Sequence, residues 1–339
     1  MPGPFSGVVV TPLPGPIVKR RYSVTQDIVG FRKCPRQYGS VHVHDYAPAH
    51  QTQLYFGTVL HQVLDRCHGH FHGVTDPHTK GTLPGGGIVV PDSDLESYLT
   101  SADAAFKAGS PPPPPPSEIV RYFLEVENGL KSQGIRAITR DQRVRVIRLL
   151  QYFDKLEGPT LYPRVRDTEH RLQADQTTHI MHGVVDLLVD DPNGGSGPGD
   201  CEIWDYKGTS RVVMTPSDLQ TYRFQMQVYA KLYELKHGIL PKQVVIYLLS
   251  ELDGPTCPTS RPVNATLEIS VSNGLGSADI AAAMSEFTTT VAAIEEARLL
   301  NHWPAADSAC ISDQDCRICD FRWDCPTPNG GKGVPLRYP

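Results

Sequence analysis

Two stretches decide the fold expected for this chain: His182-Gly183-Val184-Val185-Asp186 and Ile203-Trp204-Asp205-Tyr206-Lys207. Each reads as a strand, and they lie about one hairpin apart. A strand points successive side chains to opposite faces, so Asp205 and Lys207, two residues apart, share a face. A paired strand that carries Asp186 can place its carboxylate beside them. The sequence therefore predicts a compact acidic pocket that contains one cationic side chain, Lys207.

The predicted pocket has the chemistry of a divalent metal site. Two carboxylates held this close repel each other unless a cation lies between them, and oxygen ligands of this kind suit Mg²⁺ or Mn²⁺. The Lys207 amine could polarise a phosphate or its attacking water. The alternative is that Asp186 and Asp205 are ordinary residues at strand ends, since an Asp-x-Lys triplet alone is common. The rest of the chain decides between the two.

Length and composition indicate a globular protein. The 339 residues are 40% hydrophobic and 20% charged, enough for one large domain or two smaller ones. No stretch approaches the roughly 18 to 20 apolar residues of a spanning helix, and the proline-rich start lacks the apolar core of a secretory signal. We therefore expect a cytoplasmic protein with no membrane partner. The net charge of −5 gives no global sign of nucleic-acid binding, so local charge must carry that argument.

A cluster of arginines supplies such local charge. It lies in a segment predicted to be helical, from Ser117 to about Leu156, and its spacing near three or four lets most members share one helix face and follow a phosphate backbone. A solvated surface face is an equal alternative. The candidate nucleic-acid contacts are Arg136, Arg140, Arg143 and Arg148, with Arg145 in the same cluster.

Further helices and strands are expected around the pocket. A helix that follows Ser23 would deliver Cys34, with Pro35 ending it, and a helix over residues 56–65 places His61 next to an apolar face. Residues 170–190 are expected to form a hairpin. A helix should start at Thr215-Pro216 and run to about Lys236, with Gln225 and Tyr229 on one face.

Cysteine spacing indicates a second metal centre. Four of the eight cysteines lie between residues 310 and 325, and three of them read Cys316-x2-Cys319-x5-Cys325. In a long chain without an export signal, such spacing favours thiolates that converge on one metal rather than a disulfide framework.

The predicted organisation has five parts. Residues 73–117 are poor in large apolar side chains and contain a proline run at 111–116, which favours an extended spacer over a ligand for a partner domain. The parts are an irregular arm at 1–20, N-terminal helices with the first cysteine and His61 at 21–72, the Pro/Gly-rich insertion at 73–117, a core with a helical subregion at 118–309, and the cysteine cluster and tail at 310–339.

Six motifs follow one another along the chain. They are Ser23-Val24-Thr25 leading to Cys34-Pro35-Arg36-Gln37-Tyr38, Gly57-Thr58-Val59-Leu60-His61, Gly183-Val184-Val185-Asp186, Asp205-Tyr206-Lys207, Gln225-Met226-Gln227-Val228-Tyr229, and Cys316-x2-Cys319-x5-Cys325. In this order they resemble the RecB/AddB-like branch of the PD-(D/E)XK nucleases, in the variant with an iron–sulfur clasp. The resemblance implies a mixed α/β restriction-endonuclease-like core, with a central mixed sheet flanked by helices, that cuts phosphodiester bonds with a divalent metal.

The resemblance also implies roles for single residues. Lys207 would position or activate the attacking water and stabilise the charged transition state. Gln225 and Tyr229 would orient this lysine or the scissile strand. The Mg²⁺ or Mn²⁺ ligands would be His61, Asp186, Asp205 and the backbone carbonyl of Tyr206.

The clasp implied by the resemblance is a structural [4Fe–4S] cluster. Cys34 precedes Cys316 by 282 positions (316 − 34), so closing this loop should stabilise the fold. Zinc is the competing ion, because four-cysteine zinc sites also use a two-residue spacer, but ordinary zinc sites are more local. The ligands would be Cys34, Cys316, Cys319 and Cys325.

Three functions remain open at this point. The first is a metal-dependent deoxyribonuclease, a RecB-like exonuclease that acts on single-stranded DNA or DNA ends in repair, recombination or antiviral defence. Since the sequence has no Gly-x4-Gly-Lys-Ser/Thr phosphate loop, action on duplexes would need a separate helicase or ATPase partner. The second is a catalytically silent DNA-binding or assembly subunit. The third is a zinc-stabilised interaction protein with incidental acidic residues.

Overall fold

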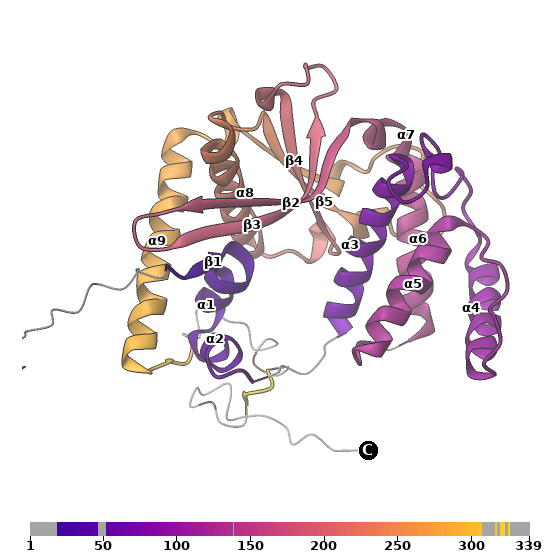
Figure 1. Ribbon diagram of the computed structural model, residues 1–339, viewed down its shortest axis with the longest axis horizontal. Helices are drawn as coiled ribbons and strands as arrows, with labels where there is room; N and C mark the ends of the chain where they lie inside the picture. The colour runs from indigo at the N-terminus through magenta and orange to yellow at the C-terminus, as the bar shows by residue number, and fades with distance from the viewer. Residues whose placement is uncertain are drawn as a thin grey trace, which may run out of the picture.

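A mixed sheet forms the centre of the fold, with helices on both sides (Figure 1). The computed structural model describes residues 19–46, 52–137 and 139–306, and near the C-terminus residues 316, 319–322 and 325, with side chains from residue 55 in the second range. Most of the predicted N-terminal arm and of the C-terminal tail lies outside the described residues. The strands are β1 Arg21–Ser23, β2 Val165–Asp175, β3 Ile180–Asp190, β4 Cys201–Lys207, β5 Gln243–Leu248 and β6 Thr266–Ser270.

Strand β3 organises the sheet because it pairs with three other strands. Antiparallel β2 runs along its whole length, so β1 and β4 share the other edge. On that edge, parallel β1 pairs with residues 180–182 and antiparallel β4 pairs with residues 187–190. Beyond β4, the sheet continues with parallel β5 and antiparallel β6. Within the described part of the chain, residues 183–186 therefore have a strand partner on one edge only.

Alternating side chains of the central strands bury two cores. On one face, Trp204 and Tyr206 pack with α3 Thr52–Phe71, α5 Glu118–Ser132 and α6 Arg140–Leu156. On the other face, Ile203 packs with α8 Pro216–His237 and α9 Ser277–Leu300. This period-two division of a strand between two apolar layers is what a sheet covered on both faces requires. The expected mixed sheet flanked by helices is confirmed (Figure 1).

Helix α8 begins where its sequence predicts. The Thr215 hydroxyl accepts the N–H of Asp218, and the Asp218 carboxylate accepts the N–H of Thr215 in return, which forms a capping box. Pro216 fits the first turn, and Gly238 ends the helix in the left-handed conformation. These caps fix the register of the helix and therefore the direction of its buried polar residues.

The predicted Pro/Gly-rich insertion contains a helix that the sequence pattern did not indicate. Helix α4, Asp92–Lys107, buries Leu95 and Leu99 and lies against α6. The proline run after it forms no helix or strand, and Tyr98 donates a hydrogen bond to the carbonyl of Pro113 at 3.2 Å. This segment is therefore packed onto the helical side of the fold.

The two ends of the described chain meet beside α2, Pro35–His42. The Trp303 ring, just after α9, lies so close to Gly39 that a Cβ there would be 2.3 Å from its Cδ2 atom. Trp303 also contacts the rings of Tyr38 and Phe31. Only glycine fits at position 39, so this contact holds the chain after α9 against the helix that follows Cys34.

The remaining helices are short or peripheral. None of the helices in the described ranges is long and apolar enough to cross a membrane. The remaining helical segments are a π-helix at Val24–Val29, α1 Gly30–Lys33, α7 Gly158–Leu161, and 3-10 turns at Pro77–Thr79, Tyr162–Arg164, Pro198–Asp200, Arg211–Val213, Leu249–Leu252, Val263–Ala265 and Val271–Asn273.

Candidate active site

The candidate site lies at the fork where β3 and β4 separate. The last paired residues are Leu187 and Trp204, so Asp186 and Asp205 are the next facing positions. The Oδ2 atom of Asp186 accepts the backbone N–H of Tyr206 at 2.6 Å. A side chain thus replaces the carbonyl that a continued ladder would supply, which fixes the Asp186 carboxylate inside the fork.

Lys207 lies beside Asp205, as strand alternation predicts. Its Nζ atom is 2.6 Å from Oδ2 of Asp205, and it also lies over the Tyr222 ring at 5.2 Å. Burial disfavours the charged amine, but the Asp205 and Asp186 carboxylates outweigh burial and raise the pKa of Lys207. The lysine therefore stays a cation at neutral pH.

The two carboxylates of the fork are electrostatically unequal. Burial raises the pKa of Asp205, and the nearby Asp186 raises it further although Lys207 opposes both. Burial acts in the same direction on Asp186, but His61, Lys207 and the Tyr206 N–H outweigh it and lower the pKa of Asp186. When two like charges share one desolvated site, one group ionises readily and the pKa of the other rises. A divalent cation would favour ionisation of both carboxylates.

Helix α3 brings His61 to the fork. Its Val59, Leu60 and Val63 side chains are buried against the sheet, which leaves His61 at the margin of the apolar face. The Nδ1 atom of His61 is 3.2 Å from Oδ1 of Asp186. Burial lowers the pKa of this imidazole, but the Asp186 carboxylate outweighs burial, so the net shift is upward.

Gln225 and Tyr229 of α8 approach the fork from the opposite face of the sheet. The Gln225 Nε2 atom donates to Oδ1 of Asp205 at 3.0 Å and to the Tyr229 hydroxyl at 3.1 Å. The Tyr229 ring packs on the backbone of Gly183, where a Cβ would lie 2.6 Å from ring atom Cε1. The two residues thus contact Asp205 and β3 rather than Lys207.

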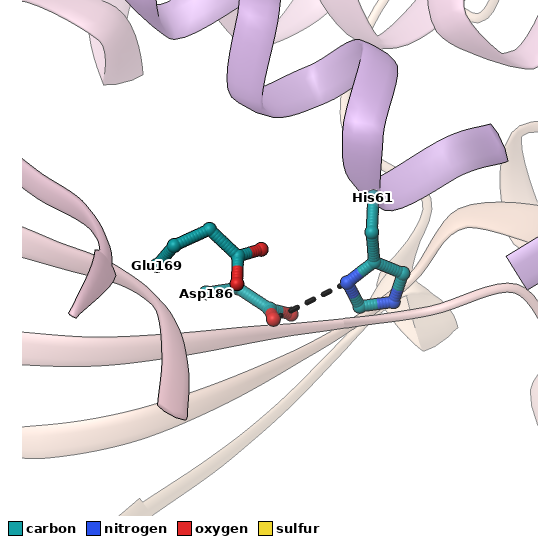
Figure 2. Close-up of side chains that lie close together, drawn as sticks. All are labelled: His61, Glu169 and Asp186. Carbon is teal, nitrogen blue, oxygen red and sulfur yellow. Dashed lines mark ion pairs between the residues drawn. The ribbon is translucent and has the colours of Figure 1, made fainter. Parts of the chain in front are cut away.

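Glu169 is a site residue that the sequence analysis missed. Ligand atoms of His61, Glu169 and Asp186 all lie within 4.8 Å of one another, the one such group of three found in the described residues, and Figure 2 shows the side chains converging. Glu169 faces Asp186 across the β2–β3 pair, because the neighbouring pairs are 168 with 187 and 170 with 185. Its backbone has a φ of 47°, a left-handed conformation that is unusual for glutamate.

Counting from the hairpin could have identified Glu169. The register pairs Asp175 with Ile180, so residues equally distant from the turn face each other, and Glu169 and Asp186 are each six positions away. No motif marks Glu169, since Thr168-Glu169-His170 resembles any polar strand.

A comparison with protein families decides the assignment. The sequence model of the PD-(D/E)XK nuclease superfamily matches residues 21–326, nearly the whole chain. The chain belongs to the PD-(D/E)XK nuclease superfamily. The matched region begins at β1 and includes the fork, α8 and the sequence Cys316-x2-Cys319-x5-Cys325. None of the curated proteins compared with the chain matches it.

PD-(D/E)XK nucleases use divalent metals, and the donor set at the fork fits such an ion. One imidazole nitrogen and two carboxylates suit Mg²⁺ or Mn²⁺. Asp205 is not part of the group of three, and its oxygens are engaged by Lys207 and Gln225. The Tyr206 side chain points away into the α3 core, where it stacks near His68.

The predicted arginine face is divided by the structure. Arg136 and Arg140 are exposed, but Arg143 is buried and ion-paired with Asp103 and Glu127, so it does not share their surface. Arg148 is half-buried and paired with Asp92 and Asp253. The interpretation of one continuous basic face is therefore wrong for Arg143, because acidic residues of α4 and α5 enclose it.

Cys319 is close enough to Cys34 and to Cys325 to interact with both electrostatically. The Cys34 sulfur caps α2 by accepting the N–H of Gln37 at 3.5 Å. Burial raises the pKa of Cys319, and Cys34 and Cys325 raise it further. Cys316 is buried, and its carbonyl accepts the N–H of Cys319 at 3.3 Å. Cys34 therefore lies near Cys319.

Proposed function

We propose that this chain is a divalent-metal-dependent deoxyribonuclease of the RecB/AddB-like branch, acting as an exonuclease on single-stranded DNA or DNA ends. The observation that carries the proposal is the β3–β4 fork, where Asp186, Asp205 and Lys207 meet His61 from α3. A purely structural ion pair would not need a histidine and a second carboxylate at the same point.

The metal would be held by His61, Asp186 and Glu169, with Asp205 and the Tyr206 carbonyl as further donors on the β4 side. Such an ion supplies Lewis acidity and a water of lowered pKa. His61 and Asp186 already lie 3.2 Å apart, so little rearrangement would be needed to point both at one centre. Asp186 and Asp205 are largely buried, which strengthens their electrostatic interactions, whereas Glu169 is exposed.

Lys207 would act as a fixed cation. Hydrolysis forms a bond from a water oxygen to phosphorus and breaks the bond from phosphorus to the leaving sugar oxygen, so charge changes on the phosphoryl oxygens. A lysine whose pKa is raised keeps its proton, which favours orienting the water and stabilising this charge over accepting a proton. Gln225 would hold Asp205, and Tyr229 would hold Gln225, so both position the lysine indirectly.

The clasp is proposed as a [4Fe–4S] cluster held by Cys34, Cys316, Cys319 and Cys325. The approach of Cys34 to Cys319 and the packing of Trp303 on Gly39 support a link between the chain ends. Anaerobically purified protein should then absorb at roughly 400 nm, where thiolate-bound iron absorbs. Stoichiometric zinc without this band would instead favour the four-cysteine zinc site.

The proposed substrate and partner follow from the same resemblance. Single strands or ends would reach the fork without unwinding, and a helicase or ATPase partner would supply them from duplexes. Roles in repair, recombination or antiviral defence are compatible with this activity. The exposed Arg136 and Arg140 are the members of the arginine cluster that remain available for a phosphate backbone.

Cleavage of labelled single-stranded DNA with Mn²⁺ tests the function. Wild-type protein should cleave, whereas Asp205→Ala and Lys207→Ala should lose at least about 100-fold in rate. Lys231→Ala, which removes a half-buried lysine of α8 paired with Glu234, is the matched control and should retain activity. Equal degradation by all variants would indicate a contaminating nuclease. DNA binding without cleavage by the wild type would favour the silent-subunit alternative.

A further inference from the structure

Gly208 and Thr209, the two residues directly after Lys207, are held by hydrogen bonds from Ser250. The carbonyl of Gly208 accepts a hydrogen bond from the Ser250 hydroxyl at 2.9 Å, and the carbonyl of Thr209 accepts the Ser250 N–H at 3.2 Å. Ser250 belongs to the 3-10 turn that follows β5. One serine thus fixes two successive carbonyls next to Lys207.

Arg145 of α6 holds this serine in place. Its Nη2 atom donates to the Ser250 hydroxyl oxygen at 3.0 Å, and its Nε atom donates to Oδ2 of Asp253 at 2.6 Å. Arg148 binds the other Asp253 oxygen at 2.5 Å. Burial would raise the pKa of Asp253, but the two arginines outweigh it and lower that pKa. The bonds to Ser250 and Asp253 fix the orientation of the Arg145 guanidinium.

The same arginine reaches the helix that carries His61. Its guanidinium lies over the Phe56 ring at 5.0 Å from the ring centre. A Cβ at Gly208 would lie 3.0 Å from Phe56 and 3.2 Å from Leu60, so the backbone of Gly208 packs directly on α3. Phe56 and Leu60 precede His61 by five and one positions. The contacts therefore connect the lysine side of the fork with its histidine side.

We propose that Arg145 is a positioning residue that, through Ser250 and Phe56, sets the position of Lys207 relative to His61. This inference rests on the proposed nuclease function. It assigns one member of the arginine cluster to the geometry of the active site and not to a phosphate of the DNA. Displacement of a reacting group by about 1 Å can cost about 100-fold in rate, so a residue that acts through Ser250 and Phe56 can still affect the chemistry strongly.

Arg148 provides a matched control. It shares Asp253 with Arg145 and lies one turn along α6, but its second ion-pair partner is Asp92 of α4, whereas Arg145 contacts Ser250 and Phe56. Arg145→Lys should lower the single-turnover cleavage rate of single-stranded DNA by about 10- to 100-fold. Arg148→Lys should change that rate by less than about 3-fold, even if the two variants lose similar thermal stability.

A double-mutant cycle with Ser250→Ala separates positioning from general stability. Since Arg145 acts through Ser250, the double variant should lose little more activity than the more impaired single variant. Fluorescence anisotropy without metal should give DNA dissociation constants within about 2-fold of wild type for Arg145→Lys. The affinity of each variant for Mn²⁺ alone should also stay within about 2-fold.

Three outcomes would overturn this role. Equal rate losses in Arg145→Lys and Arg148→Lys would indicate a general effect on the fold. Weaker DNA binding with an unchanged single-turnover rate would make Arg145 a substrate contact. Additive losses in the cycle would show that Arg145 and Ser250 act separately. Failure of the wild type to cleave DNA would refute the nuclease function itself, so the two failures are distinguishable.

Discussion

Asp186 and Asp205 occupy facing positions one step beyond the last paired residues of β3 and β4. The strands separate there, and the Asp186 carboxylate takes the N–H of Tyr206 in place of a backbone carbonyl. The separation makes room for side chains from both faces of the sheet, His61 from α3 and Gln225 from α8. An active site can therefore form within a sheet that is otherwise covered by helices.

Replacement of Glu169 by glycine should separate stability from metal binding. Glycine adopts a positive φ without a Cβ penalty, so Glu169→Gly should stabilise the metal-free protein by about 1 kcal/mol, seen as a higher Tm. The same change removes a carboxylate from the group with His61 and Asp186, so Mn²⁺ affinity should fall about 10-fold or more.

The control for Glu169 is Asp175→Asn, which removes a carboxylate from the far end of the same strand. Asp175 pairs with Lys19 at an exposed position, so its loss should leave Mn²⁺ affinity unchanged. Isothermal titration of all three proteins gives the comparison. Unchanged affinity in Glu169→Gly would exclude Glu169 from the metal site.

Gly183→Ala should disturb the α8 side of the fork. The new Cβ would lie 2.6 Å from the Tyr229 ring, so the ring or β3 must shift, at a cost of about 1–3 kcal/mol. Cleavage should weaken as well, because Tyr229 contacts Gln225. Gly57→Ala in α3, where nothing lies within 4 Å of the added atom, should instead be neutral or slightly stabilising. Denaturant unfolding of both variants would contradict this account if their midpoints matched.

Helix α8 and the pair of Asp205 and Lys207 could be predicted from the sequence because local rules determine both. Thr215-Pro216 and Asp218 specify a helix start through caps alone, and Asp205 and Lys207 share a face by strand alternation. Glu169 could not be found in the same way, since its role depends on the hairpin register and on a backbone conformation that glutamate rarely adopts.

The arginine cluster and α4 show where tertiary contacts override sequence pattern. Arg143 has the helical spacing of its neighbours, but Asp103 of α4 and Glu127 of α5 bury it. Residues of a segment interpreted as a spacer thus determine which arginines stay exposed. Few large apolar residues were enough for α4 to pack, because Leu95 and Leu99 lie one turn apart on one face.

The arginines should separate into two classes on mutation. Arg143→Ala removes the guanidinium partner of buried Glu127, which keeps only Lys131 and the Tyr55 hydroxyl, so the free energy of unfolding should fall by about 1–3 kcal/mol. The double change of Arg136 and Arg140 to alanine should leave Tm nearly unchanged but weaken DNA binding and reduce the salt slope of log Kd by up to about 2. An unchanged salt slope in the double variant would assign these two side chains to solvent alone.

Asp154 should make stability depend on pH. Burial raises its pKa to about 6, although the Tyr162 hydroxyl and the Gly85 N–H oppose the shift. Between about pH 4 and 6 the folded protein keeps a proton that the unfolded chain loses, so the free energy of unfolding falls as pH rises through this range. Asp154→Asn removes this proton exchange and keeps an oxygen for the Gly85 N–H.

Measurements of wild type and Asp154→Asn from pH 4.5 to 7 test this linkage. The stability of the variant relative to wild type should increase with pH by about 1–3 kcal/mol in total. Parallel pH profiles would mean that Asp154 ionises in the folded protein as it does in the unfolded chain.

The most direct test of the fork as a metal-dependent active site is a Mn²⁺ titration of wild type and Asp186→Asn, followed by electron paramagnetic resonance. The account predicts saturable binding at the fork in the wild type and a loss of at least about 10-fold in affinity in Asp186→Asn, which removes the charge between His61 and Glu169. Equal binding by both proteins, or no saturable binding by the wild type, would contradict it.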